Sequence, residues 1–149
     1  MGWIDSLRGE VVGLDTTPLI YFIEENSTYL ELVSPFFEAI DQGEVSVVTS
    51  IVTLLEVLVH PFKHGDAALV QQYRDILLNS QGLTTIPLSQ DIAEEAARIR
   101  ATHNIRTPDA IQMATASYMG ASHFLTNDAR LPSLPELKVL VLDQVAEGQ

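Results

Sequence analysis

Four acidic residues, Asp15, Glu56, Asp109 and Asp128, stand at positions in the sequence where we do not expect ordinary charged side chains of a solvated surface. Their carboxylate oxygens are hard ligands, which Mg²⁺ and Mn²⁺ prefer to the nitrogen and sulfur ligands typical of zinc sites. If the fold brings the four together, their like charges repel one another, and only a cation would hold them in one place. The sequence therefore predicts a site for Mg²⁺ or Mn²⁺ and leaves the number of ions open.

Such a site would do its chemistry through water. A divalent cation lowers the pKa of a bound water molecule and neutralises charge on a phosphate, so hydrolysis of a phosphodiester bond is the natural reaction class. The sequence has no cysteine, and its four histidines lack the spacing of a zinc site. Hydroxyl and amide side chains adjoin the acids and are expected to orient them: Thr16, Ser50, Thr126 and Asn127.

Strands and helices must alternate to bring these acids together, and the apolar pattern predicts this alternation. Short apolar runs predict strands at residues 11–14, 45–49, 83–88, 123–126 and 139–142. Helical spacing predicts helices at residues 18–23 (capped by Thr16 or Thr17), 29–41, 52–60 (stopped by Pro61), 67–79, 92–102 and 107–119. This order is typical of a single α/β domain, a three-layer sandwich around a five-stranded parallel sheet.

The predicted elements place the acids in unusual positions. Asp15 ends the first strand and Asp128 follows the fourth, and an open parallel sheet binds ligands outside the carboxyl ends of its strands. Asp109 lies in the first turn of a helix that opens with Thr107 and Pro108. Glu56 interrupts an apolar stretch whose helix is expected to be buried almost all round, where a carboxylate is costly unless it is paired or bound to metal.

Each acid also has an ordinary interpretation. Asp15 could cap the first helix, and Asp128 could be a turn residue. Asp109 could favour a helix N-terminus, which stabilises a negative charge by about 0.3–1 kcal/mol. Glu56 could pair with a buried cation, although no Lys or Arg stands at helical spacing from it. For Asp109 and Asp128 alone the ordinary role is the better interpretation, whereas four acids on one rim favour a metal site.

Composition sets the remaining limits. The 149 residues, 46% of them hydrophobic and 19% charged, suit one folded domain at 11–142, with an N-terminal extension at 1–10 and a polar tail at 143–149. No apolar run approaches the roughly 18–20 residues of a membrane span. The absence of cysteine fits a reducing cytoplasm. The net charge of −12, from eight basic and twenty acidic residues, opposes nucleic-acid binding and attracts divalent cations or a basic partner.

Four segments resemble, in order, the four motifs of PIN-domain nucleases: residues 15–20 (DTTPLI), 49–58 (TSIVTLLEVL), 106–112 (RTPDAIQ) and 126–128 (TND). Their order, intervals and strand contexts all agree, and the resemblance covers about residues 11–142. The sequence is most similar to the VapC-like toxins of bacterial toxin–antitoxin pairs. Two features depart from the pattern: Thr17 stands where the family often has Asn, and about ten residues precede the first strand.

This resemblance implies a five-stranded parallel sheet, a homodimer, Mg²⁺-dependent cleavage of RNA, and an antitoxin that occludes the site. Asp15 and Asp109 would be the leading metal ligands, Glu56 and Asp128 would complete the acidic cluster, and Thr126 would be the supporting hydroxyl. A basic antitoxin segment would suit the acidic surface. Arg106 and Arg130 flank the motifs and are expected to contact the RNA.

Two other function classes stay in view. The first is a non-catalytic PIN-fold module that binds RNA or protein, which loss of an acid would favour; all four acids are present. The second is another acid-site α/β enzyme. A haloacid-dehalogenase-type phosphatase needs Asp-x-Asp after the first strand, where this chain has Asp15-Thr16-Thr17, and a dinucleotide-binding fold needs the absent G-x-G-x-x-G.

Overall fold

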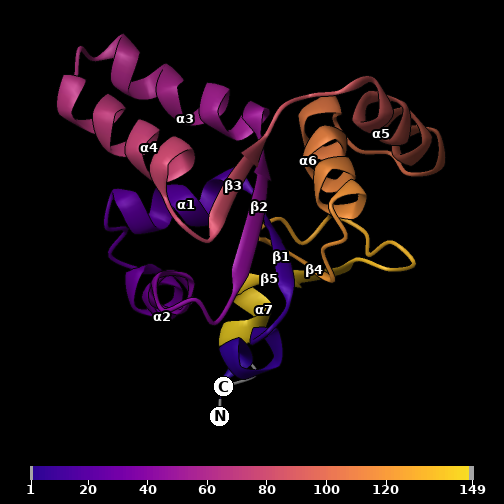
Figure 1. Cartoon of the computed structure of the whole chain (residues 1–149), viewed down its shortest axis with the longest axis horizontal. Coiled ribbons are helices and arrows are strands. Elements are labelled where there is room, and N and C mark those ends of the chain that lie inside the picture. The colour runs from indigo at the N-terminus through magenta and orange to yellow at the C-terminus, as the bar shows by residue number, and fades with distance from the viewer. Residues whose placement is uncertain (1, 148–149) are drawn as a thin grey trace.

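The computed structural model describes residues 2–147. Its elements follow one another along the chain (Figure 1) as η1 (Trp3–Leu7), β1 (Val11–Leu14), α1 (Thr16–Ile23), α2 (Leu30–Asp41), β2 (Ser46–Ser50), α3 (Ile51–Lys63), α4 (Ala67–Asn79), β3 (Leu83–Ile86), α5 (Gln90–Thr102), α6 (Thr107–Tyr118), β4 (His123–Thr126), β5 (Lys138–Val141) and α7 (Leu142–Glu147). No helix among these residues is long and apolar enough to span a membrane.

The five strands form one sheet in the order β3-β2-β1-β4-β5, and every pair is parallel. Strand β1 is central: Gly13 pairs with Val48 of β2 on one side and with Phe124 of β4 on the other. Because the strands are parallel, Asp15, the end of β2 and the end of β4 meet at the same edge of the sheet. The predicted fold class is confirmed.

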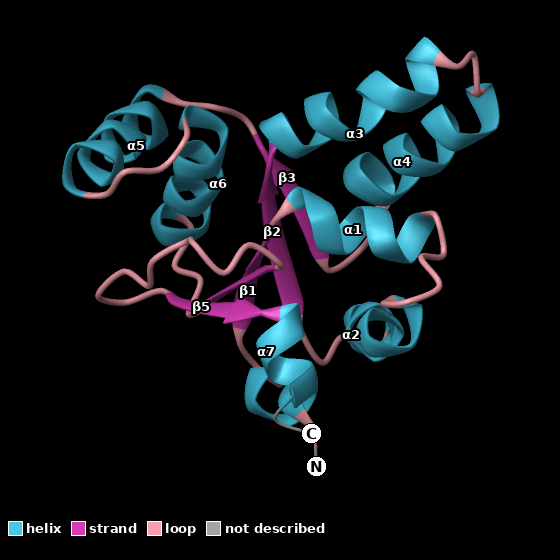
Figure 2. Ribbon diagram, turned by 180° about the vertical axis from the view of Figure 1, so that it is seen from behind, coloured by secondary structure: helices cyan, strands magenta, loops and turns pink. Residues whose placement is uncertain are grey.

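Helices cover both faces of the sheet, as Figures 1 and 2 show, with α1 to α4 on one side and α5 and α6 on the other. Alternate residues of the strands supply the two cores. Leu14 and Val47 pack into the core under the first group of helices, and Val48 and Phe124 pack into the core under α5 and α6. This alternation is what a parallel sheet buried on both faces requires.

Gly13 allows α6 to lie directly on β1. A Cβ atom at this position would come 2.4 Å from Cβ of Ala116 and 2.9 Å from Cδ1 of Phe124. We expect Gly13→Ala to lower the free energy of unfolding by about 1–3 kcal/mol, because β1 and α6 must move apart. Urea denaturation measures this loss, and Gly2→Ala, where a Cβ meets nothing within 4 Å, is the control. An unchanged midpoint for Gly13→Ala would contradict the close packing.

Two predicted C-terminal ends differ from the structure by two residues or more. Helix α3 continues through Pro61 to Lys63, and the N–H of His64 still donates to the carbonyl of His60. Pro61 lies in the last turns of the helix and its ring is buried, so the lost hydrogen bond is offset by packing. Strand β3 ends at Ile86, because Pro87 cannot donate to a neighbouring strand.

The prediction that α3 is buried almost all round is wrong. One stripe of this helix is exposed and apolar: Ile51, Leu55, Val59 and Phe62. Leu55 and Phe62 are each 65% exposed. The opposite side, with Thr53, Val57 and Leu58, faces the protein. Continuous apolar sequence thus marks a helix with two apolar sides, of which this domain covers one.

The chain outside the predicted limits of 11 and 142 also joins the fold. In the extension, Ile4 and Leu7 are buried and Trp3 stacks on Phe36 with ring centroids 5.8 Å apart. Most of the predicted tail belongs to α7, in which Val145 packs against the core. Met1 and residues 148–149 lie outside the described part of the chain. The domain limits therefore stay predictions, while the core uses side chains from both ends.

Candidate metal and active site

Asp15 lies at the junction of β1 and α1 and is 9% exposed. Its Oδ1 accepts the backbone N–H of Thr16 at 2.7 Å, which makes Asp15 rather than Thr16 or Thr17 the N-cap of α1. Its Oδ2 accepts the hydroxyl of Thr126, at the end of β4, also at 2.7 Å. Asp15 therefore caps α1 and also lies at the edge of the sheet where parallel sheets bind ligands.

The surroundings of Asp15 oppose its negative charge. The pKa of this carboxyl is raised to about 6, chiefly by burial and in smaller part by the charges of Asp109 and Glu56, against the two hydrogen bonds from Thr126 and Thr16. No positively charged side chain within the described residues compensates this carboxylate. A buried anion that lacks a cation partner is the electrostatic condition for binding one.

Glu56 faces Asp15 from the second turn of α3. Its Oε1 accepts the hydroxyl of Thr16 at 2.7 Å and the amide Nε2 of Gln112 at 2.9 Å. The carboxylate is half-buried, and the donors that hold it are neutral. No positively charged side chain within the described residues donates a hydrogen bond to Glu56.

Asp109 completes this group from the first turn of α6. Its pKa is raised, chiefly by burial and further by the charges of Asp128 and Glu56, while Arg106 opposes the shift. The pKa of Asp15 and that of Asp109 are thus both raised by Glu56. Asp109 and Asp128 also line one small cavity, of about 80 Å³, together with Arg106 and Arg130.

Asp128 differs from the other three because an arginine holds it. The Nε and Nη2 atoms of Arg130 each donate to one oxygen of Asp128 at 2.9 Å, and these bonds lower the pKa of the carboxyl. The N–H of Asp128 donates to the Thr126 hydroxyl at 3.0 Å, so Asp128 is joined to Asp15 through Thr126. In this structure the guanidinium of Arg130 is occupied by Asp128, although its side chain is 83% exposed.

The sequence from residue 12 to residue 137 matches the PIN domain family. The chain belongs to the PIN domain family. Solved structures with similar folds include VapBC2 from Rickettsia felis bound to a DNA fragment from its promoter, at TM-score 0.70 and 18% identity over 88% of this chain and 98% of that one. No curated protein sequence matched this chain.

Two further structures resemble this PIN domain. A toxin–antitoxin complex from Klebsiella pneumoniae has TM-score 0.66 and 24% identity over 89% of this chain and 97% of that one. VapC20 from Mycobacterium tuberculosis, a sarcin-ricin loop cleaving toxin, has TM-score 0.63 and 14% identity over 76% of this chain and 86% of that one. These likenesses are of fold, and membership of the PIN family supports a nuclease-type activity for the chain.

The donors at the PIN edge fit a hard divalent cation in their chemistry. All four side chains offer carboxylate oxygen, and the buried Asp15 has no cationic partner. Within residues 2–147 no three acidic or histidine side chains are already arranged as a metal cluster. The hydrogen bonds explain part of this arrangement, because the carboxylate of Asp128 is turned to Arg130. A cation that bound all four acids would share the carboxylate of Asp128 with Arg130 or replace Arg130 there.

Four other side chains beside the acids have distinct places. Thr16 and Thr126 touch the acids directly, as expected. Ser50 is buried and caps α3 by accepting the N–H of Val52 at 3.1 Å, so it orients Glu56 only through the helix. Asn127 accepts the N–H of Asp143 and donates to the hydroxyl of Tyr21, and it bonds none of the four acids within the described chain. Their functional roles stay predictions.

Gln112 is the residue that sequence reasoning missed. It stands three residues after Asp109 and therefore on the same face of α6, which was the available signal. Its contact with Glu56 joins residues 56 positions apart in the chain, and that contact follows only from the packing of α3 against α6.

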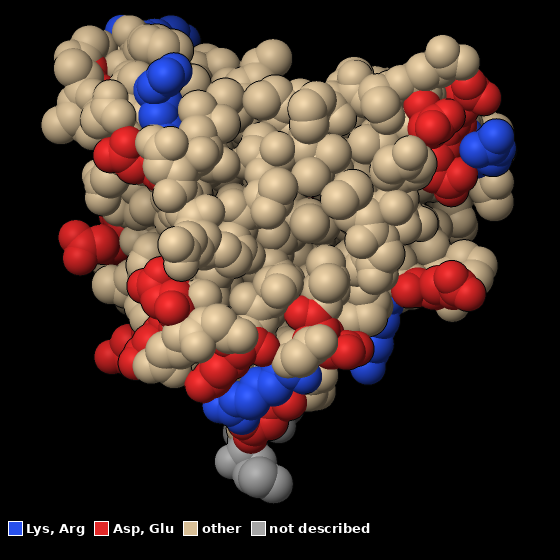
Figure 3. All heavy atoms as spheres, viewed as in Figure 1, with Lys and Arg blue, Asp and Glu red and all other residues tan. Residues whose placement is uncertain are grey.

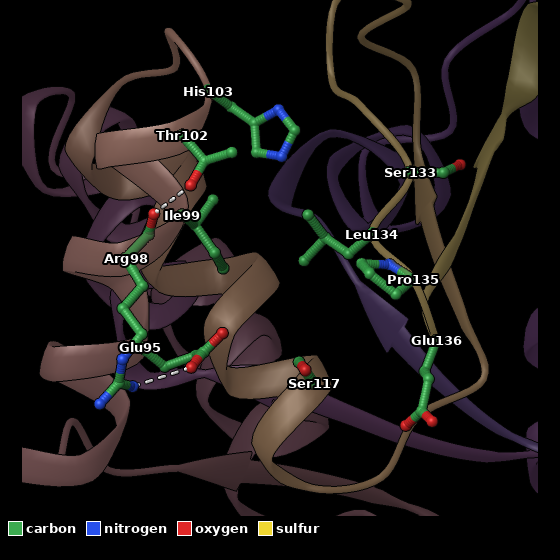
Figure 4. Close-up of a pocket in the computed structure, with 10 residues that line it drawn as sticks. All are labelled: Glu95, Arg98, Ile99, Thr102, His103, Ser117, Ser133, Leu134, Pro135 and Glu136. Carbon is green, nitrogen blue, oxygen red and sulfur yellow. Dashed lines mark hydrogen bonds and ion pairs between the residues drawn. The ribbon is translucent and has the colours of Figure 1, made fainter.

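A second and larger cavity, of about 810 Å³, lies away from this chemistry. Figure 4 shows α5 on one side, with Arg98, Thr102 and His103, and the segment at 133–136 on the other. None of the four carboxylates lines it, and Arg98 is engaged with Glu95 at 3.0 Å. The small cavity beside Asp109 and Asp128 is therefore the one that matters for the proposed chemistry.

Proposed function

We propose that this PIN-domain chain is a Mg²⁺- or Mn²⁺-dependent endoribonuclease and the toxin of a toxin–antitoxin pair, acting on RNA in the cytoplasm. The observation that carries the proposal is the buried, uncompensated carboxylate of Asp15 at a sheet edge that it shares with Glu56 and Asp109. Support for RNA comes from VapC20, which is described as cleaving the sarcin-ricin loop, and support for the toxin role comes from the other toxin–antitoxin structures.

Asp15, Glu56, Asp109 and Asp128 would hold the ion, which when bound supplies an activated water and neutralises charge on the phosphate. The chain's own residues prepare the place. Thr16 and Thr126 each fix one oxygen of Asp15, and each of these oxygens keeps a second lone pair free. Burial of Asp15 excludes water from one side of the site, which strengthens charge interactions there.

RNA must approach a chain of net charge −12, so the arginines beside the acids matter. Arg106 and Arg130 line the same small cavity as Asp109 and Asp128, which supports a role in holding phosphates. Arg130 is paired with Asp128, whereas the N–H groups of Arg106 make no side-chain hydrogen bond within residues 2–147. We therefore expect Arg106 to contribute more to RNA affinity in the metal-free protein.

Arg106→Ala is expected to weaken RNA binding at low salt about 5-fold to 10-fold. It should also reduce the slope of log affinity against log salt concentration by about one, which corresponds to the loss of one phosphate contact. Arg130→Ala is expected to have a smaller effect in EDTA. Fluorescence anisotropy with labelled RNA in EDTA, which prevents cleavage, measures both. Arg98→Ala is the control, because Arg98 pairs with Glu94 and Glu95 away from the acids. Unchanged affinity in both variants would remove the arginines from the proposal.

A homodimer and a basic antitoxin are the proposed partners. The exposed stripe of α3, with Leu55 and Phe62, supports a protein contact, because monomers rarely leave such a stripe open. Figure 3 shows a broad area without charged side chains in the middle of one face, with acidic side chains and fewer basic ones near its edges. The exposed stripe of α3 supports an apolar contact, and the acidic side chains around the uncharged area support a basic partner segment. A mass in solution of twice 16.4 kDa is expected for the dimer.

The direct test is cleavage of purified RNA by the purified chain with Mg²⁺, with Mn²⁺ and with EDTA. The proposal expects internal cuts that require the metal. If no RNA is cut with either ion, while the folded chain still binds RNA or a partner protein, the alternative of a non-catalytic PIN-fold module is favoured.

A further inference from the structure

Gln112 joins three elements at the acidic edge of the sheet. Its side chain is 3% exposed, and its Nε2 lies 2.9 Å from Oγ1 of Thr16 and 2.9 Å from Oε1 of Glu56. The hydroxyl of Thr16 also donates to Oε1 of Glu56 at 2.7 Å. One oxygen of Glu56 thus receives two neutral donors, from α1 and from α6. The other oxygen, Oε2, has no hydrogen-bond partner in the described chain.

The orientation of the Gln112 amide follows from its neighbours. A carboxylate oxygen can only accept, and the Thr16 hydroxyl uses its proton on Glu56, so the amide atom that faces both must be the NH₂ group. The carbonyl oxygen of the amide is then forced to the other side. This atom, Oε1 of Gln112, is buried and finds no partner among residues 2–147. A buried acceptor without a partner is costly and needs an explanation.

An apolar side chain of similar volume would avoid this cost, so simple packing of α6 does not explain a glutamine here. Gln112 also shares its helix face with Asp109, three residues earlier. Through Thr16, whose backbone N–H donates to Asp15, the amide is linked to the most buried acid. It therefore connects the helix that carries Asp109 with the segments that carry Asp15 and Glu56.

We propose that Gln112, together with Thr16, is a positioning residue: the two hold Oε1 of Glu56 so that Oε2 stays available to a divalent cation, and the buried, unpartnered carbonyl of Gln112 is the cost of placing its NH₂ group on Glu56. The proposal rests on the proposed metal-dependent function. It assigns Gln112 a role that acts through Glu56, with no contact to the reacting phosphate.

The test measures Mn²⁺ binding, by electron paramagnetic resonance of the free ion, for the unchanged chain and for Gln112→Met. The variant keeps the volume and removes both polar atoms of the amide. We expect Mn²⁺ to bind about 10-fold to 100-fold more weakly, as is typical when a group that orients a metal ligand is lost. We also expect the melting temperature in EDTA to be equal or higher, because the unpartnered carbonyl is gone. A merely structural role would instead lower the melting temperature and leave Mn²⁺ affinity unchanged.

Thr16→Val removes the second donor to the same oxygen and serves if Gln112→Met does not fold. Thr115→Val is the matched control, because Thr115 is buried on the same helix and its hydroxyl donates to its own helix, at Ile111. If the unchanged chain binds Mn²⁺ and the folded Gln112 or Thr16 variant binds it equally well, the inference is overturned and the proposed function stands. If the unchanged chain binds no Mn²⁺, both are overturned. If it binds Mn²⁺ but cuts no RNA, only the proposed function fails.

Discussion

Asp109→Asn is expected to reduce metal-dependent RNA cleavage on the order of 10³-fold while the fold survives. The change removes one negative charge and keeps the shape of a side chain in the first turn of α6. Asp109 is half-buried and feels the charges of Asp128 and Glu56, so in the metal-free chain its charge is opposed rather than needed. Loss of that charge should therefore spare folding and damage only the binding of the ion and the reaction it supports.

The measurement compares initial cleavage rates at saturating Mg²⁺, with circular dichroism as the check on folding. Asp15→Asn is expected to lose activity to the same extent, because the carboxylate of Asp15 is near enough to feel the charges of both Asp109 and Glu56. Asp91→Asn is the matched control: Asp91 is also an acid in the first turn of a helix, on α5, and it lies outside the small cavity beside Asp109. Equal rates for Asp109→Asn and the unchanged chain would remove Asp109 from the proposed site.

The parallel sheet, and the edge of the sheet on which the acids lie, could both be predicted from the sequence. Strand β1 is a short apolar run that stops at a carboxylate, and a parallel sheet sends every such stop to the same edge. The places of Asp15 and Asp128 at this edge follow from chain order alone. Glu56 stood out in the sequence as one charge in an apolar helix. The expectation that this helix is buried almost all round was wrong, because α3 leaves one side exposed.

Contacts between distant segments could not be predicted in this way. The triangle of Glu56, Thr16 and Gln112 depends on how α1, α3 and α6 approach one another, which no local pattern specifies. Arg130 and Asp128 are only two residues apart, yet their pairing depends on the side-chain rotamers that they adopt, which their spacing in the sequence does not determine. Helix α3 passed through Pro61 because tertiary packing of the buried ring outweighed the local preference to stop.

Asp15→Asn is also expected to stabilise the metal-free chain at neutral pH. The pKa of Asp15 is raised from 3.8 to about 6 in the folded state, so between these pH values the folded chain holds a proton that the unfolded chain has released. The free energy of unfolding must then fall as the pH rises through this window, by up to about 3 kcal/mol from this group. An asparagine carries no charge and removes this dependence.

The variant should keep most of the local hydrogen bonding. Its amide oxygen can still accept the N–H of Thr16, and its NH₂ group faces the hydroxyl of Thr126, which can accept as well as donate. In EDTA, therefore, we expect the variant and the unchanged chain to have similar stability near pH 4, and the variant to be more stable near pH 7. Urea denaturation across this range measures the difference.

Mg²⁺ or Mn²⁺ should reverse this order. An ion that binds only the folded, unchanged chain raises its stability by RT ln(1 + [ion]/Kd), about 2.7 kcal/mol at a hundred times Kd, and the asparagine variant gains little of this. The carboxylate of Asp15 then lowers the stability of the folded chain without the ion and raises it with the ion. A side chain that only capped a helix would not depend on the ion in this way. A stability difference that depends on neither pH nor metal would mean that Asp15 serves α1 as a cap and nothing more.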